Sequence, residues 1–260
     1  GRFAPQRRPF SFAICNNLFI LIVSFFIIRK KRGSYYGPKK YQPYLFGRSF
    51  FGFLGLITLF YASSHAAQGD VTVLNKLSPI FVTLLAAVFM KEKLSPIQIP
   101  ALALSVIGAF IVFRPSFQSD PFPLVVALLS AITSGVAYTF LGYFKGKVDG
   151  ITVIMHFSTF SVFGSLPFVI SNFVMPDPHQ FMLVSLFGSL GQVFITYAYR
   201  FAPASEISIY NYSGILFSIV LGAAILGEPV KSTSILGGAL VAIASIMVYI
   251  YGNSKKQAGK

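Results

Sequence analysis

An internal repeat is the feature that most constrains this chain. The sequence matches itself when it is shifted by 136 positions, the separation between Asn75 and Asn211. The aligned pairs include an FG-x-LG segment, a Tyr-Ala pair and three polar positions: 51–55 with 187–191, Tyr61 with Tyr197, Asp70 with Glu206, Asn75 with Asn211, and Glu92 with Glu228. Duplicated halves of a hydrophobic chain often enclose a transport site between them, so the repeat limits both fold and function.

The composition assigns the chain to the membrane. Hydrophobic residues make up 55% of it and charged residues only 11%, whereas a soluble domain carries about 25% charged residues. Apolar runs of about 20 residues, the length of a membrane span, recur almost from end to end. The pattern predicts an all-α polytopic transmembrane helical bundle with about nine spans, at residues 10–28, 46–64, 71–90, 95–113, 122–143, 151–172, 181–199, 204–226 and 233–251.

The distribution of reactive residues argues against an enzyme. Cys15 is the single cysteine, and the three histidines lack metal-ligand spacing, so we expect no disulfide, metal or cofactor. The spans contain no paired carboxylates or Ser/His constellation, and there is no phosphate-binding glycine loop. The net charge of +14 is interpreted as membrane topology rather than as a nucleic-acid surface.

Basic residues predict the orientation. Alternate connections carry the Lys and Arg residues, at 29–32, Lys91, Lys145 and Arg200, and the C-terminal tail adds more. Positively charged loops face the cytoplasm, so we expect a multi-pass plasma-membrane protein with a cytoplasmic C-terminus.

The repeat is predicted to be inverted. Glu92 then ends its helix on the cytoplasmic side and its mate Glu228 on the outer side, which requires an odd number of helices in each repeat. We expect two inverted five-helix repeats, with about nine of the ten spans present. The first repeat covers residues 1–118 and lacks its first helix, and the second covers residues 119–252. Residues 253–260 are expected to form a cytoplasmic tail. A nine-span protein is the alternative.

Several motifs resemble the EamA family of the drug/metabolite transporter superfamily. They are Tyr61-Ala62, Asp70-Val71-Thr72, Ser78-Pro79-Ile80-Phe81, the helix end at Met90-Lys91-Glu92, and Leu226-Gly227-Glu228 in the second copy. Pro9-Phe10-Ser11-Phe12 with Asn17 is similar to the start of the family's second helix, where Asn16 replaces a usual Arg. The resemblance implies a ten-helix carrier that moves small metabolites, including amino acids and drug-like solutes, by alternating access.

The polar residues inside the spans are candidates for substrate binding, because an unpaired polar group in hydrocarbon needs a partner or a wet cavity. Asn75 and Asn211 either line a central cavity or pair between helices. Lys76 either meets an anionic substrate or extends to the interface. Tyr61 and Tyr197 offer an aromatic wall, and the further candidates are Tyr138, Gln192 and His156.

Other polar positions are assigned structural roles. Asn16, Asn17 and Arg48 are interpreted as interfacial or anchoring residues, and Glu92 and Glu228 as structural helix ends. Pro79 marks a kink that the second repeat, with Ile215 there, does not duplicate.

The predicted function is a secondary transporter, an exporter or exchanger of small metabolites. Uncoupled facilitation or exchange is favoured over proton coupling, because only His156 could carry a proton within a span. The alternatives are an exchanger of nucleotide sugars or sugar phosphates, or a membrane scaffold or sensor that does not transport. Stripes of small residues allow a homodimer.

Overall fold

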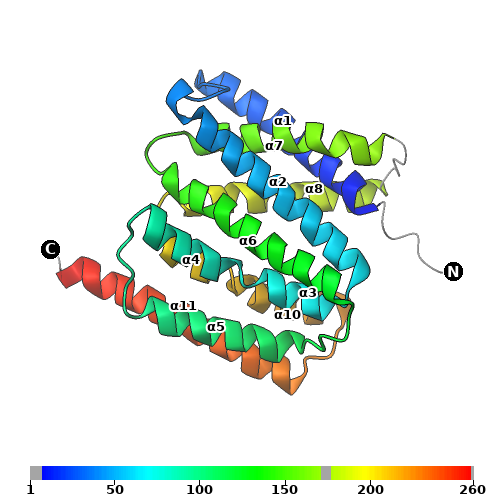
Figure 1. The fold of residues 1–260 in the computed structure, drawn as a ribbon, viewed down its shortest axis with the longest axis vertical. Helices are drawn as coiled ribbons and strands as arrows, with labels where there is room; N and C mark the ends of the chain where they lie inside the picture. Colours follow the sequence, from blue (N-terminus) through cyan, green and yellow to red (C-terminus); the bar gives the residue numbers. More distant parts are fainter. Residues whose placement is uncertain (1–7, 171–176, 259–260) are drawn as a thin grey trace.

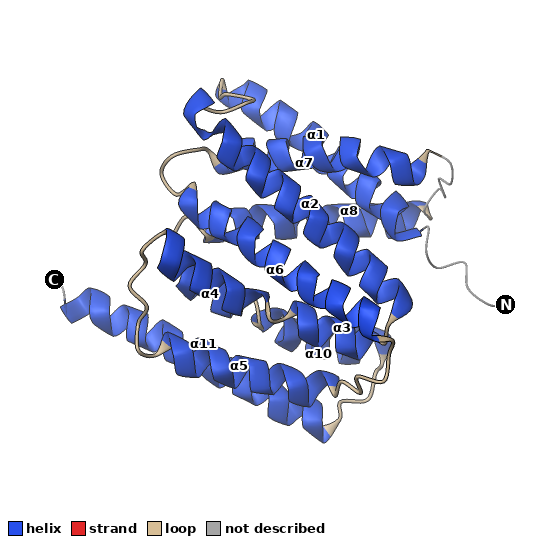
Figure 2. Cartoon of the chain, viewed as in Figure 1, coloured by secondary structure: helices blue, strands red, loops and turns tan. Residues whose placement is uncertain are grey.

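The computed structural model describes residues 8–170 and 177–258, which are helical throughout apart from turns and loops (Figures 1 and 2). The α-helices are α1 (Arg8–Lys31), α2 (Gln42–His65), α3 (Gln68–Asn75), α4 (Ser78–Phe89), α5 (Gln98–Phe113), α6 (Pro121–Tyr143), α7 (Gly150–Val169), α8 (Pro178–Ala198), α9 (Ala204–Tyr210), α10 (Ser213–Leu226) and α11 (Ser232–Ala258). A short 3-10 helix, η1 (Lys39–Tyr41), precedes α2.

The predicted membrane-spanning bundle is confirmed. Eight segments of the described chain are long and apolar enough to cross a bilayer, and α5 is a shorter apolar helix. Two of the eight, Gln68–Phe89 and Ala204–Ile225, each contain two consecutive helices, α3 with α4 and α9 with α10. The nine apolar stretches of the sequence are therefore present, two of them interrupted.

The helices repeat with the same shift as the sequence. Displaced by 136 positions, α2, α3 and α4 coincide with α8, α9 and α10 to within a few residues at each end. The mates α5 and α11 pack along each other in opposite directions, since Ala101 lies in one cluster with Ala244 whereas Gly108 contacts Gly237. Antiparallel packing of equivalent helices is the signature of an inverted repeat.

Small residues let α5 and α11 approach closely. A Cβ built on Gly108 would lie 2.7 Å from the carbonyl oxygen of Gly237, a backbone approach that only glycine permits. Ala101, Ser105 and Ala109 are buried in the same interface or beside it. The small-residue stripe of α5 therefore joins two helices of one chain.

Both broken spans stop at equivalent positions. Helix α3 ends at Asn75, four residues before Pro79. A proline ring clashes with the carbonyl of the fourth residue before it, here Asn75, so a regular helix cannot continue through this point. Helix α9 ends at Tyr210 although Ile215 occupies the position of the proline. The expectation that the interruption is not duplicated is wrong, because contacts between the repeats satisfy both breaks.

Those contacts are reciprocal. The Lys76 ammonium donates a hydrogen bond to the carbonyl of Asn211 at 3.2 Å. The hydroxyl of Tyr212 donates one to the carbonyl of Lys76 at 2.6 Å. Asn211 and Lys76 are the C-cap residues that directly follow α9 and α3, and a helix end leaves carbonyls without an intrahelical partner.

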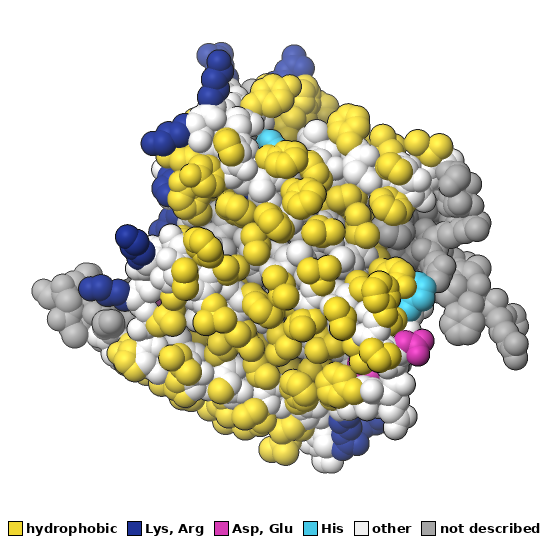
Figure 3. All heavy atoms as spheres, viewed as in Figure 1, with side chains coloured by type: hydrophobic (Ala, Val, Ile, Leu, Met, Phe, Trp, Pro, Cys, Tyr) yellow, Lys and Arg dark blue, Asp and Glu magenta, His cyan; other side chains and the backbone are white. Residues whose placement is uncertain are grey.

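Charge is unevenly distributed over the surface. Figure 3 shows Lys and Arg side chains along the edge where the C-terminus lies, with a smaller basic group at one corner and apolar side chains between the edges. Helix α11 continues to Ala258, so the described part of the tail expected at 253–260 is helical.

Candidate substrate cavity

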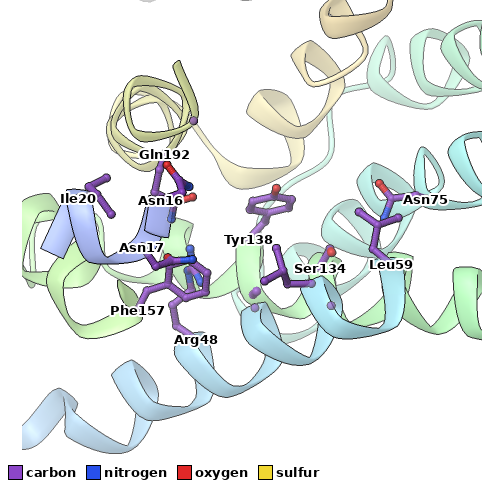
Figure 4. A pocket seen from close by; sticks show the side chains of 15 residues that line it. Asn16, Asn17, Ile20, Arg48, Leu59, Asn75, Ser134, Tyr138, Phe157 and Gln192 are labelled. Atoms are coloured by element: carbon purple, nitrogen blue, oxygen red, sulfur yellow. The ribbon is translucent and has the colours of Figure 1, made fainter. Parts of the chain in front are cut away.

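A cavity of about 210 Å³ lies between the two repeats. Its walls come from α1, α2 and α3 of the first repeat and from α6, α7 and α8 of the second. Figure 4 shows Asn16, Asn17, Arg48 and Gln192 towards one end of the cavity, Asn75 at the other end, and Tyr138 and Ser134 between them. This volume is below the roughly 300–1,000 Å³ of drug-sized sites, which fits a small solute.

Arg48 is a buried cation in the wall of this cavity. It lies about 9 Å along α2 from Gln42, the first residue of that helix, and only 3% of its surface is exposed. The guanidinium carbon lies 4.2 Å from the ring centroid of Phe157. Gly52, one turn later, makes room for the head group, because a Cβ there would overlap Nη1 of Arg48.

Arg48 has no counter-ion among the described residues. The ion pair found within 8–170 and 177–258 joins Arg200 to Asp149, at 3.1 Å, and Nε of Arg48 has no hydrogen-bond partner there. A charged residue inside a span is costly and is normally paired with a carboxylate or with backbone carbonyls. The expectation that Arg48 anchors α2 at the interface is wrong, because the side chain turns inward onto Phe157.

Amide side chains surround the same end of the cavity. Asn17 donates one amide hydrogen to the carbonyl of Ala13 at 2.9 Å, which leaves its Oδ1 and its second amide hydrogen for other contacts. Asn16 Oδ1 accepts from Ser189 at 3.4 Å. Nε2 of Gln192 is a buried donor without a partner in the described chain. Asn16 and Asn17, for which the sequence favours an interfacial role, lie about two turns inside α1 and both line the cavity.

Asn75 and Tyr138 line the cavity, as the sequence predicts. Asn75 donates to the hydroxyl of Ser130 at 2.8 Å, which ties α3 to α6. The Tyr138 ring is parallel to that of buried Tyr199, with 5.8 Å between centroids. Asn75 therefore combines the two roles left open for it, lining the cavity and pairing helices.

Two predicted site residues belong to the helix breaks instead. Asn211 and Lys76 are not among the residues that line the cavity. The Asn211 carbonyl accepts the hydrogen bond from Lys76. The Lys76 ammonium thus bonds to the opposite repeat and does not line this cavity.

The tyrosine mates lie at opposite ends of the bundle. Tyr61 is 37% exposed and stacks on His65 and against Phe122. Tyr197 donates to Asp149 at 3.3 Å, near Arg200. Late positions in two inverted helices reach opposite faces, so these rings do not form one wall.

His156 lies behind the cavity wall. Its Nδ1 is 3.0 Å from the hydroxyl of Ser49, and the residue borders a separate groove lined by Tyr35, Tyr36 and Phe160. Its neighbour Phe157 is the one that faces the cavity.

The helix-end glutamates differ between the repeats. Glu92 accepts three hydrogen bonds at the start of α9, from the backbone nitrogens of Ala204 and Ser205 at 2.9 and 3.0 Å and from the Ser205 hydroxyl at 2.8 Å. Its mate Glu228 is exposed. Both glutamates keep the same backbone bond, to Ala86 at 3.1 Å and to Gly222 at 3.1 Å, so the local turn is duplicated whereas the contact between repeats is not.

The sequence does carry a signal for the residues that its first interpretation missed. Gly52 and Gly188 are repeat mates, and each lies against a polar group of the cavity, Arg48 and Asn16. The mates Leu56 and Gln192 also line it. The repeated FG-x-LG segment therefore marks the cavity wall, one turn away from the buried arginine.

Comparisons with known proteins agree with this architecture. The model of the EamA-like transporter family matches residues 2–114 and 121–250. A pseudopaline exporter of Pseudomonas aeruginosa is 29% identical over 209 residues, which cover 78% of this chain and 74% of that protein. Solute carrier family 35 member G1 of Homo sapiens is 25% identical over 255 residues, covering 87% and 67%.

A solved crystal structure shares the fold. It superimposes with a TM-score of 0.79 at 17% identity and covers 94% of this chain and 89% of its own. The family model spans both repeats and most of the sequence. The chain therefore belongs to the EamA-like transporter family and is a membrane transporter.

Proposed function

We propose that this protein is a secondary transporter that exports, or exchanges, small polar metabolites across the plasma membrane by alternating access. The observation that carries the proposal is the cavity of about 210 Å³, with amide and guanidinium groups in its wall, that three helices from each repeat line. A solute site between inverted halves is the arrangement that rocking of one half against the other can expose to each side in turn.

The broken spans support this mechanism. Breaks at equivalent positions of two inverted halves free backbone groups near the middle of the bundle. Here Lys76 and Tyr212 bond those groups across the repeats. Such contacts can be exchanged when the halves move, without leaving a carbonyl exposed to lipid.

The orientation follows from charge. Lys and Arg side chains gather on the edge at which α11 ends (Figure 3). By the positive-inside rule this edge faces the cytoplasm, and the C-terminus with it. The name of the bacterial exporter to which the chain is similar favours outward transport.

An exchanger of nucleotide sugars or sugar phosphates is the weaker candidate. Several phosphate charges call for several cations, and Arg48 is the one Lys or Arg in the described lining. The cavity is also small for a nucleotide.

Transport in proteoliposomes tests the proposal. Vesicles holding the purified protein are loaded with an extract of small cellular metabolites, and release is followed by mass spectrometry against protein-free vesicles. We expect saturable release of a small subset of solutes. Release equal to that of protein-free vesicles would reject a transport function.

A matched pair of variants tests the site. Asn75→Ala removes a cavity-lining amide, and Asn211→Ala removes the amide of its mate, outside the cavity. We expect the first to raise KM by about tenfold, the value of one lost hydrogen bond of about 1.4 kcal/mol, and the second to leave KM unchanged. An equal change of KM in the two variants would reject the placement of the substrate site in this cavity.

A further inference from the structure

We infer that the transported solute carries a carboxylate, which binds Arg48, and a hydrogen-bond donor close to that carboxylate. This inference rests on the proposed function and names the class of its substrate. It follows from the groups that the cavity leaves without partners.

The first group is the Arg48 guanidinium. A cation in a span is normally paired with a carboxylate or a backbone carbonyl, and no carboxylate of the described chain pairs with this one. Phe157 covers one of its faces, and the space at Gly52 accommodates Nη1. The head group is thus held in place but left uncompensated beside a cavity, where an anionic solute can complete the pair.

The second group is Gln192. Its Nε2 is a buried donor with no acceptor in the described chain, and it lines the end of the cavity shared with Arg48 (Figure 4). A carboxylate has two oxygens and only accepts hydrogen bonds. Binding one to Arg48 and Gln192 satisfies both of these donors at once.

The remaining lining defines the rest of the solute. One amide hydrogen of Asn17 is bonded to Ala13, and its Oδ1 remains as an acceptor for a donor of the solute, such as an ammonium or hydroxyl group. Beyond this end the walls include the apolar side chains of Ile20, Leu56 and Leu59. The lining therefore fits a small amino or hydroxy acid with an apolar portion.

Charge balance favours a carboxylate over a phosphate. A carboxylate carries one negative charge and matches one guanidinium, whereas a phosphate monoester carries close to two. Lys76, the nearest basic residue on the broken spans, already donates to Asn211 and does not line the cavity.

The test compares classes of released solutes. Proteoliposomes with wild-type protein, Arg48→Gln or the control Arg29→Gln are loaded with the metabolite extract, supplemented with amino and hydroxy acids and their carboxamides. Arg29 is exposed at the end of α1, so its variant loses the same charge without touching the cavity.

We expect wild-type protein and Arg29→Gln to release acids and retain the matched carboxamides. Arg48→Gln should release the acids at least tenfold more slowly. Wild-type release confined to neutral, cationic or phosphorylated solutes would overturn the inference and leave the transport function standing. No release by the wild type would overturn both.

A stability measurement separates binding from a structural role. Because Arg48 has no counter-ion, the solute-free Arg48→Gln protein should melt at the same temperature as the wild type or above it. A lower Tm together with undiminished acid release would mark Arg48 as structural and overturn the inference. If Arg48→Gln does not fold, Arg48→Lys decides: slower release of acids supports the inference, and unchanged release overturns it.

Discussion

Lys76 and Tyr212 occupy equivalent positions of the two repeats, and the side chain of each donates a hydrogen bond to the helix break of the other. The Lys76 ammonium reaches the carbonyl of Asn211 at 3.2 Å, and the Tyr212 hydroxyl reaches the carbonyl of Lys76 at 2.6 Å. Two different side chains thus perform the same task by symmetry. They connect the halves at the point where each half is least regular.

The Tyr212 bond can be removed alone. Tyr212→Phe keeps the buried ring but leaves the Lys76 carbonyl without its donor, which should cost about 1–3 kcal/mol and lower the Tm in detergent. Tyr249→Phe, on an exposed ring near the end of α11, serves as the control and should change nothing. Equal Tm values for the two variants would show that the hydrogen bond from Tyr212 does not stabilise the helix break at Lys76.

Glu92 and Glu228 form a second matched pair. Glu92→Gln places an amide group opposite the backbone donors that begin α9, so we expect a loss of about 1.5–3 kcal/mol, the range for hydrogen bonds to a charged group. Glu228→Gln alters an exposed side chain and should be neutral. Thermal unfolding of the two proteins checks this. A destabilised Glu228→Gln would mean that the mates act alike.

Glycine at position 52 is predicted to set the position of Arg48. A Cβ there would overlap Nη1, so Gly52→Ala should displace the guanidinium and slow transport by at least tenfold while the protein stays folded. Gly191→Ala is the control on the facing repeat, since a Cβ there meets nothing within 4 Å. Initial rates in proteoliposomes and melting curves distinguish displacement from unfolding. Full activity of Gly52→Ala would contradict the prediction.

His156 is predicted not to carry a coupled proton. Its ring bonds to Ser49 outside the cavity, and a proton carrier must exchange with the solute space. His156→Gln should therefore keep the rate and the pH profile of transport, measured with an imposed pH gradient. A pH dependence that disappears in this variant would return His156 to the mechanism.

Sequence reasoning succeeded where a property was periodic or duplicated. The spans follow from runs of apolar residues, and the inverted halves follow from Glu92 and Glu228 on opposite predicted faces. Asn75, Tyr138 and Gln192 were proposed because a polar group inside a span needs a wet surface or a partner. All three line the cavity, and their contact with a substrate stays a prediction.

The same reasoning failed where the environment of a side chain had to be inferred from its position in the sequence alone. Arg48 lies near a basic loop, so position alone favoured the interface; only the packing of α2 on α7 shows that Phe157 draws it inward. The break after Tyr210 was missed for a related reason. It has no proline, and the contact from Lys76 comes from a residue far away in the chain.

The sequence by itself determined that this protein is a helical membrane bundle of two related halves, because hydrophobic length and self-similarity are properties of the chain alone. Only the tertiary structure decided which polar residues face the cavity, that Lys76 and Tyr212 bridge the repeats, and that Glu92 but not Glu228 contacts the other half. The physical reason is that each polar group must find its partner in space. For Lys76, Tyr212 and Glu92 that partner lies in the opposite repeat, far away in the sequence.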